Sequence, residues 1–334
     1  MNRHPIPFSR HFVERVRRPR GMTRDLAAVL NQLGFAAKFL AREVGNAALK
    51  GHLGFAGEVN ATGDAQKKLD VIGNEALLDA VADTGLVSAY LSEEFDEIRM
   101  LEENAPYIFV TDPLDGSSNT DINGAVGTIF GIYSSPHPAT PEKVLEAIAL
   151  PPVAAGYVFY GTSTILIYTT GQEVMGFTLD RDFGEFLLSH ENIRCPERGI
   201  FFSANAARLR EWSPGLQAYI QYVTQRDKPT GRPYSLRYSG ALVADLHRCL
   251  VEGGLYLYPG DAQNPDGKLR LVYECAPLAF VVESAGGRAS CGNGRTLELK
   301  ARKLHQRCPV YIGSAGEVTL LEKFLQEEKQ GARS

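Results

Sequence analysis

The sequence is poor in cysteine, and its cysteines show no paired spacing. Five cysteines stand among 334 residues, and they are scattered singly along the second half of the chain. An odd number of isolated cysteines with no C-x-x-C pair argues against a disulfide framework and against a cysteine-ligated zinc site. We therefore expect the chain to occupy a reducing compartment, the cytoplasm.

Long apolar runs and a strong net charge are also missing. No apolar run approaches the roughly 20 residues that cross a bilayer, and no secretory signal is visible. The chain has 35 basic and 39 acidic residues, a formal charge of −4, which is no electrostatic footprint for nucleic acid. We predict neither a membrane nor a nucleic acid as partner, and a hydrophobic content of 44% predicts an ordinary globular core.

The pattern along the chain predicts mixed α/β structure in two parts. Segments with apolar residues at helical spacing alternate with short apolar runs of strand length. The predicted elements are a helix over 23–44, a long glycine-rich loop over 45–66, a helix over 68–81, strands over 86–91, 107–111 and 126–133, a connection over 134–152, strands within 155–188, a helix over 241–251, a strand over 254–258 and a helix over 273–284. A change of pattern near residue 199 divides the chain into domains 1–199 and 200–334.

The most informative stretch is Asp112-Pro113-Leu114-Asp115-Gly116-Ser117-Ser118, which follows the apolar run 107–111. A strand that ends there presents two carboxylates three residues apart, and the glycine with the two serines supplies a tight turn of backbone N–H groups. Carboxylates bind hard divalent cations, and clustered N–H groups bind phosphate oxygens. Taken alone, the motif is equally compatible with a solvated turn.

Further acidic side chains stand at the predicted ends of other elements. They are Glu93 and Glu94 after the strand over 86–91, Asp64 and Asp70 around the start of the second helix, and Glu274 at the start of a late helix. Strand ends that converge on one edge of a sheet form the ligand sites of α/β proteins. If these groups meet, they could hold two or three Mg²⁺ ions around a phosphoryl group. For each acid taken alone, a surface salt bridge is the ordinary alternative.

Basic and aromatic side chains that suit a second phosphate also lie near predicted strand ends. They are Lys268 and Arg270 after the turn 265–267, Arg237 with Tyr238, and Tyr258. Arginine and lysine bind phosphate through charge-assisted hydrogen bonds. For the two tyrosines, a half-buried aromatic position is the ordinary alternative.

Together these segments resemble class I fructose-1,6-bisphosphatases, within the lithium-sensitive, Mg²⁺-dependent sugar phosphatase superfamily. The likeness runs over roughly residues 8 to 325 and is strongest in 62–71, 92–94, 112–119, 127–130, 154–157, 237–238, 243–245, 267–270 and 273–275. All seven carboxylates of the family pattern are present, and chance does not account for so many ordered matches. The resemblance implies the layered sugar phosphatase fold, an α/β (α+β) structure with α-β-α-β-α layers.

The resemblance also implies roles for the acidic residues. The implied metal ligands are Glu93, Asp112, the Leu114 carbonyl, Asp115 and Glu274, with Asp64 serving a third ion and counted among the catalytic residues. Asp70 and Glu94 are implied to activate the attacking water as general base. The resemblance further implies that Arg270 pairs with Asp64.

The substrate contacts that the resemblance implies fall into two groups. Gly116, Ser117 and Ser118 hold the 1-phosphate. The 6-phosphate and the sugar are held by Asn205, Tyr238, Tyr258 and Lys268, and Arg237 reaches the 6-phosphate of a neighbouring subunit. The contact of Arg237 with a neighbouring subunit implies that the protein is an oligomer.

The implied activity is Mg²⁺-dependent hydrolysis of the 1-phosphate of fructose 1,6-bisphosphate, with two or three Mg²⁺ ions per active site and Mn²⁺ as an alternative metal. The implied partners are a small sugar bisphosphate and further copies of the chain, in a homotetramer or a dimer of dimers. Two alternatives stay open: a sedoheptulose-1,7-bisphosphatase, alone or as a second activity, and an inactive metabolite-binding scaffold.

The sequence departs from the family pattern where many members bind AMP. Their Thr-Gly-Glu-Met/Leu-Thr turn reads Thr23-Arg24-Asp25-Leu26-Ala27, Pro106 replaces a lysine and Ser134 replaces an arginine. Losing contacts worth about 1.5–3 kcal/mol each would largely abolish AMP binding, so we expect weak or no AMP inhibition. The sugar site departs as well, because an Asn-Glu-Gly-(Tyr or Asn) run reads Asn205-Ala206-Ala207-Arg208, and Arg208 could supply charge there.

Overall fold

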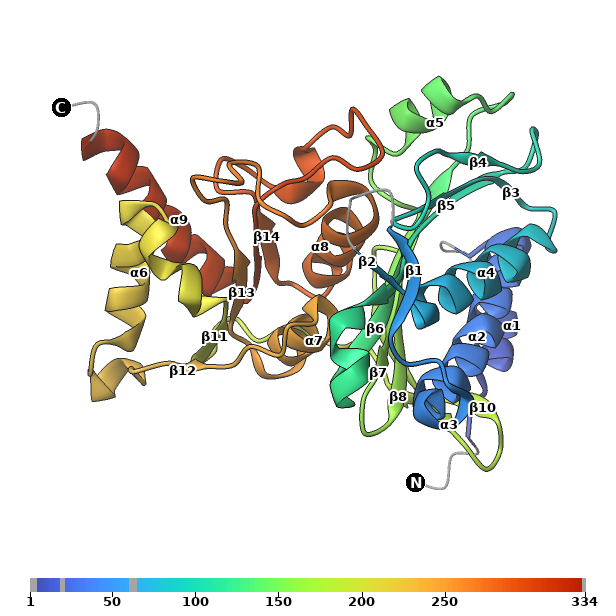
Figure 1. Ribbon diagram of the computed structural model, residues 1–334, viewed down its shortest axis with the longest axis horizontal. Coiled ribbons are helices and arrows are strands. Elements are labelled where there is room, and N and C mark those ends of the chain that lie inside the picture. The colour runs from blue at the N-terminus through green and yellow to red at the C-terminus, as the bar shows by residue number, and fades with distance from the viewer. Residues whose placement is uncertain (1–4, 19–21, 60–64, 332–334) are drawn as a thin grey trace.

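The computed structural model describes residues 5–18, 22–59 and 65–331. Its helices and strands form layers that can be followed from right to left in Figure 1. A helical layer covers an eight-stranded sheet, a second helical layer separates this sheet from a five-stranded sheet, and a third lies outside the five-stranded sheet. The predicted α/β fold with α-β-α-β-α layers is confirmed.

The first helical layer contains α1 (Phe8–Val16), α2 (Arg24–Gly45) and α4 (Lys68–Ala82). Helix α2 begins where the sequence predicts, because the Thr23 hydroxyl accepts the N–H of Leu26 at 3.0 Å and caps the first turn. The apolar face of α2 is buried in one core with residues of the large sheet, and each large side chain on it contributes about 1.5–3 kcal/mol. Neither α2 nor any other helix among the described residues is long and apolar enough to cross a membrane.

The eight-stranded sheet has the strand order β10-β9-β8-β7-β6-β5-β3-β4. Its strands are β3 (Val87–Ser92), β4 (Arg99–Met100), β5 (Tyr107–Asp115), β6 (Val126–Ser134), β7 (Ala154–Tyr160), β8 (Thr164–Thr169), β9 (Val174–Asp180) and β10 (Glu185–His190). Strands β3 and β5 are parallel, so both end at the same edge of the sheet. The ring of Phe109 stacks between those of Tyr90 and Phe130, with centroids 5.8 and 6.4 Å away, and ties β3, β5 and β6 together.

The second half of the chain supplies the remaining layers. Helices α7 (Leu242–Glu252) and α8 (Ala276–Ser284) pack against both sheets. The five-stranded sheet, in the order β12-β11-β13-β15-β14, consists of β11 (Phe201–Ser203), β12 (Ser235–Leu236), β13 (Leu255–Tyr258), β14 (Arg288–Ser290) and β15 (Val310–Gly313). Helices α6 (Pro214–Thr224) and α9 (Ala315–Gly331) lie on its outer face. One hydrophobic cluster joins Tyr157, Leu246 and Ile312, so the two sheets share a core; the division into domains 1–199 and 200–334 stays a prediction.

The long loop predicted over 45–66 contains regular structure, and that part of the prediction was wrong. Helix α3 (Ala47–Lys50) follows α2, and strands β1 (Phe55–Val59) and β2 (Ala65–Lys67) then pair as an antiparallel hairpin. Gly51, Gly54 and Gly57 all have positive φ angles. They divide the segment into pieces that are too short to leave a readable hydrophobic period.

Two boundaries were also placed wrongly, and one helix was missed. Strand β5 continues to Asp115, although the apolar run that predicts it stops at residue 111. Its register against β6 shifts between Asp112 and Asp115, where Pro113 has no N–H to donate. Helix α5 (Pro141–Ala147) lies in the segment predicted as a connection. One π-helical turn (Leu271–Cys275) precedes α8, so Glu274 lies before this α-helix rather than at its start.

Candidate active site

A cavity of about 470 Å³ opens where the ends of β3 and β5 meet the β1–β2 hairpin. Ten residues that the sequence predicts as catalytic, metal or phosphate groups line it: Asp70, Glu93, Glu94, Asp112, Leu114, Asp115, Gly116, Ser117, Ser118 and Glu274. They come from segments that are far apart in the sequence, so the fold brings them together. Asp64, also predicted for this site, lies outside the described residues.

Three carboxylates converge in this cavity. Glu93 follows β3, Asp112 lies on β5 and Glu274 lies on the π-helical turn, and one carboxylate oxygen from each lies within 4.8 Å of the other two. Burial raises the pKa of Asp112, and the charges of Glu93, Asp115 and Glu274 raise it further. Burial and the charge of Glu93 also raise the pKa of Glu274, which the Arg270 charge opposes. Carboxylate oxygens crowded in this way suit a hard divalent cation.

Asp115 lines the same cavity and also holds the start of α7. Its two oxygens accept the N–H groups of Leu242 at 3.1 Å and of Val243 at 2.7 Å. Burial raises the pKa of Asp115 to about 7, and these two hydrogen bonds act in the opposite direction. Each carboxylate oxygen has further lone pairs, so this anchoring role leaves the side chain able to face a cation.

The turn after Asp115 has a conformation that only glycine adopts easily. Gly116 has a φ of 76°, and a Cβ at this position would lie 2.5 Å from the Cβ of Ala241. A 3₁₀ helix (Ser117–Ile122) follows directly. The turn therefore brings main chain and short side chains, rather than bulky groups, next to the carboxylates.

Asp70 and Glu94 are two further buried carboxylates with shifted acidity. Burial raises the pKa of Asp70 to about 7, although the Lys67 N–H donates to its Oδ2 at 2.8 Å. Burial raises the pKa of Glu94 to about 8, and the charges of Asp70 and Glu93 add to this. Among the described residues, Asp70 Oδ1 is buried without a hydrogen-bond partner. Carboxylates with pKa values near neutrality are suited to exchange protons with water.

Arg270 contacts two of the three convergent carboxylates. Its guanidinium lies 3.3 Å from Glu93, and its backbone N–H donates to Glu274. The residue is 8% exposed, so these contacts are shielded from bulk water. The pairing of Arg270 with Asp64 that the resemblance implies stays a prediction, because Asp64 lies outside the described part of the chain.

A second, smaller pocket collects three of the residues predicted to hold the sugar and the 6-phosphate. Its lining consists of Asn205, Tyr258 and Lys268 together with Arg208, Trp212, Leu257, Pro259 and Asp261. The Arg208 guanidinium lies 2.8 Å from Glu211 and 3.9 Å from Asp261. This pocket therefore combines two cations with aromatic and amide groups, as phosphate and sugar recognition requires.

Charged residues of both pockets act on the hydroxyl of Tyr258. Burial raises the pKa of its hydroxyl; Arg208 and Asp261 of the small pocket act on it, and so do Glu274 and Arg270 of the carboxylate cavity. Tyr238 is 41% exposed and interacts electrostatically with Tyr258. Arg237, the next residue along, is exposed, and its guanidinium donates to the carbonyl of Leu236.

Sequence reasoning missed Lys67, which lines the carboxylate cavity. Its side chain is buried, and its Nζ lies 2.6 Å from Asp121 and 4.0 Å from the ring centroid of Phe55. A signal existed, because an acidic residue at the third position of a helix can accept the backbone N–H of the residue directly before the helix. Asp70 accepts the Lys67 N–H in this arrangement.

Comparisons with known proteins identify the family. A model described as "Fructose-1-6-bisphosphatase, N-terminal domain" matches residues 6–191, and one described as "Fructose-1-6-bisphosphatase, C-terminal domain" matches residues 195–326. The chain belongs to the fructose-1,6-bisphosphatase family. The resemblance drawn from the sequence motifs is thereby confirmed.

Curated relatives within the fructose-1,6-bisphosphatase family match the chain almost end to end. A class 1 fructose-1,6-bisphosphatase of Acaryochloris marina is 54% identical over 331 residues, which cover 98% of this chain and 99% of the relative. The class 1 fructose-1,6-bisphosphatase of Chlorobaculum tepidum is 45% identical over 325 residues, which cover 96% and 97%.

Solved fructose-1,6-bisphosphatase structures have the same fold. The holo form of the Leishmania major enzyme matches with a TM-score of 0.90 at 38% identity, over 96% of this chain and 99% of that one. The T-state of the same enzyme matches with a TM-score of 0.85 at 36% identity. The likeness thus covers almost the whole of both chains.

Proposed function

We propose that this chain hydrolyses the 1-phosphate of fructose 1,6-bisphosphate and releases fructose 6-phosphate and inorganic phosphate. The observation that carries the proposal is the convergence of Glu93, Asp112 and Glu274 beside the Gly116 turn. Its relatives are named for the same activity. The small pocket around Lys268 supplies a place for the phosphate that is not cleaved.

The reaction requires a divalent metal, and the residues present fit one. Glu93, Asp112 and Glu274 offer hard oxygen ligands. Burial and the neighbouring carboxylate charges raise the pKa values of Asp112 and Glu274, and a bound cation would favour their ionised forms. We assign Mg²⁺ to them, two or three ions per site, with Asp115 and the Leu114 carbonyl as further ligands and Mn²⁺ as a substitute. Bound metal supplies charge neutralisation at the phosphoryl group and its leaving oxygen.

Other side chains would position the reactants and move the proton. Asp70 and Glu94 are suited to take the proton of the attacking water, because burial brings their pKa values to about 7 and about 8. Gly116, Ser117 and Ser118 would hold the phosphate that leaves. Asn205, Tyr238, Tyr258 and Lys268 would hold the sugar and the distal phosphate.

We also propose that the chain forms a homotetramer. Arg237 is exposed and lies one residue from Tyr238, so its guanidinium is available to the distal phosphate of a neighbouring copy. Light scattering on the purified protein should give four times the mass of the chain, and a monomer would contradict this proposal.

The test of the activity is phosphate release by the purified protein from fructose 1,6-bisphosphate. Release is expected with Mg²⁺, is expected to stop with EDTA, and should be restored by added Mg²⁺ or Mn²⁺. Phosphorus NMR should show that the 1-phosphate leaves. Sedoheptulose 1,7-bisphosphate, assayed in parallel, tests the alternative substrate. Absence of release with either metal would overturn the proposed function.

A further inference from the structure

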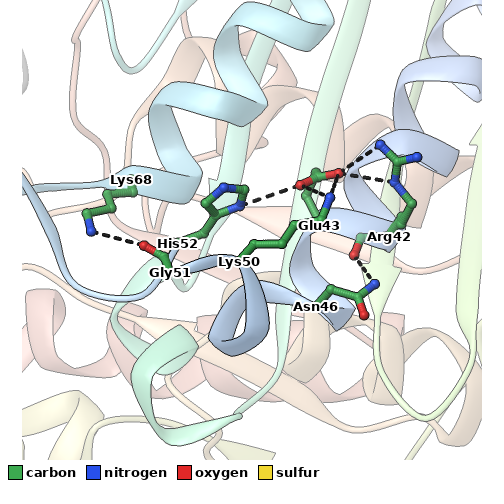
Figure 2. Close-up of polar contacts among 7 residues, drawn as sticks. All are labelled: Arg42, Glu43, Asn46, Lys50, Gly51, His52 and Lys68. Carbon is green, nitrogen blue, oxygen red and sulfur yellow. Dashed lines mark hydrogen bonds and ion pairs between the residues drawn. The ribbon is translucent and has the colours of Figure 1, made fainter.

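A buried carboxylate outside the carboxylate cavity gathers a lysine, an arginine and a histidine side chain. Glu43, on the last turn of α2, is 3% exposed. Its oxygens lie 2.5 and 2.7 Å from the Lys50 ammonium, 3.0 and 3.1 Å from the Arg42 guanidinium, and 3.5 Å from Nδ1 of His52 (Figure 2). Burial by itself would raise the pKa of Glu43, but the hydrogen bonds from Lys50 and Arg42 outweigh it and lower the pKa.

Two of these partners lie on the segment that leads from α2 to the β1–β2 hairpin. Lys50 is the last residue of α3, and His52 follows two positions later. Arg42 lies on α2 next to Glu43, so its contact joins nothing beyond that helix. Glu43 therefore links the end of α2 to residues 50–52 through Lys50 and His52, as Figure 2 shows.

The same segment is fixed at its other side to the wall of the cavity. The Lys68 ammonium, at the start of α4, donates to the Gly51 carbonyl at 3.0 Å, and the Gly54 N–H donates to Asp121 at 2.9 Å. Asp121 also holds the Lys67 ammonium at 2.6 Å. Two residues of the hairpin, Phe55 and Lys67, line the cavity directly, so the position of residues 50–54 sets one wall of the site.

We propose that Glu43 is a positioning residue that holds the β1–β2 hairpin in place beside the carboxylate cavity. The proposal rests on the proposed function for its effect on rate. Without the Glu43 charge, the Lys50 and Arg42 cations would face each other with no anion between them, and residues 50–52 would move away from α2. Without Arg42, the carboxylate and its links to Lys50 and His52 would remain.

This difference defines a matched set of variants. Glu43→Gln removes the central charge, Lys50→Gln removes one link between α2 and the hairpin segment, and Arg42→Gln removes a cation of equal charge that makes no such link. Lys50 and Arg42 are 36% and 63% exposed at the side chain, so both replacements leave the core intact. We expect a ten- to hundred-fold lower kcat for the first two, the scale of a displacement of about 1 Å at an active site. We expect KM to change much less, and Arg42→Gln to match the unmodified protein.

Hydrogen exchange of the metal-free protein tests the same link without an activity assay. Faster exchange of residues 51–57 is expected in Glu43→Gln and Lys50→Gln and not in Arg42→Gln, with exchange in the large sheet unchanged. Equal behaviour of all three variants, or a fall in melting temperature without local exchange, would overturn the proposal. If the unmodified protein does not hydrolyse the bisphosphate, the proposed function fails, while the exchange pattern still decides whether Glu43 holds the hairpin.

Discussion

The carboxylates of Asp112 and Glu274 lie within 4.8 Å of each other, although one belongs to β5 and the other to a π-helical turn of the second half of the chain. Both are buried, burial raises the pKa of each, and the charge of Glu274 raises that of Asp112 further. Two like charges held this close destabilise the folded chain unless a cation or a proton intervenes. The carboxylate cluster therefore favours cation binding and lowers the stability of the metal-free protein.

Asp112→Asn should abolish activity and stabilise the metal-free protein. The substitution removes one of the convergent carboxylate charges that would hold the metal. A loss of about 4 kcal/mol of transition-state stabilisation by the metal corresponds to roughly a thousand-fold lower rate. It also removes repulsion with Glu93 and Glu274, so the melting temperature in EDTA should rise. Asp182→Asn, at an exposed turn, is the matched control and should change neither quantity. A lower melting temperature for Asp112→Asn in EDTA would contradict the prediction.

The stability of the metal-free protein should depend on pH through the buried carboxylates. Burial raises the pKa of Asp70 and of Asp115 to about 7 and that of Glu94 to about 8. Between the usual carboxyl pKa near 4 and these values, the folded state binds more protons than the unfolded state, so the free energy of unfolding in EDTA should fall as pH rises toward 8.

The affinity for Mg²⁺ should rise with pH, because the cation binds the deprotonated carboxylates. Calorimetry in two buffers of different ionisation enthalpy should detect proton release at pH 7, and the apparent Mg²⁺ affinity should increase from pH 6 to pH 8.5. Mg²⁺ binding without proton release, together with an Mg²⁺ affinity independent of pH, would show that the carboxylates are already ionised in the metal-free protein.

Sequence reasoning could place the carboxylates at the site because strand ends and short motifs are local features. Glu93 and Asp112 follow from two parallel strands that end at one edge, and Gly116 from the turn chemistry of its motif. The contact of Asp115 with Leu242, 127 residues away, could not be predicted, since it depends on how α7 packs between the sheets.

The hairpin beside the site shows the same limit. Its strands are short and interrupted by glycines, so no hydrophobic period marks them, and the pair of Lys67 with Asp121 joins segments 54 residues apart. The cluster around Glu43 is close in sequence, but its burial depends on the sheet and helices around it. Local patterns thus reveal which chemistry is present, and packing decides which of these charges are removed from water.

AMP should not inhibit the enzyme at micromolar concentration. The Thr23 hydroxyl caps α2 and lies 2.7 Å from the Tyr107 hydroxyl, and Arg24 replaces the glycine that would let a phosphate approach the first turn. Pro106 and Ser134 supply no positive charge. Titration of the activity with AMP, with CMP as a control for metal chelation, is the measurement, and inhibition by micromolar AMP alone would contradict the prediction.

Arg208 should contribute to recognition of the distal phosphate. Its guanidinium shares the small pocket with Lys268 and lies 2.8 Å from Glu211 and 3.9 Å from Asp261. A charge-assisted hydrogen bond to phosphate is worth about 1.5–3 kcal/mol, so Arg208→Gln should raise KM for fructose 1,6-bisphosphate about ten-fold or more. Turnover of fructose 1-phosphate, which has no distal phosphate, should be unaffected. Arg208 and Arg210 lie on one 3₁₀ helix (Ala206–Glu211), and the control Arg210→Gln should leave KM for both substrates unchanged. Equal losses on both substrates would show that Arg208 supports the fold of the pocket instead of contacting the phosphate.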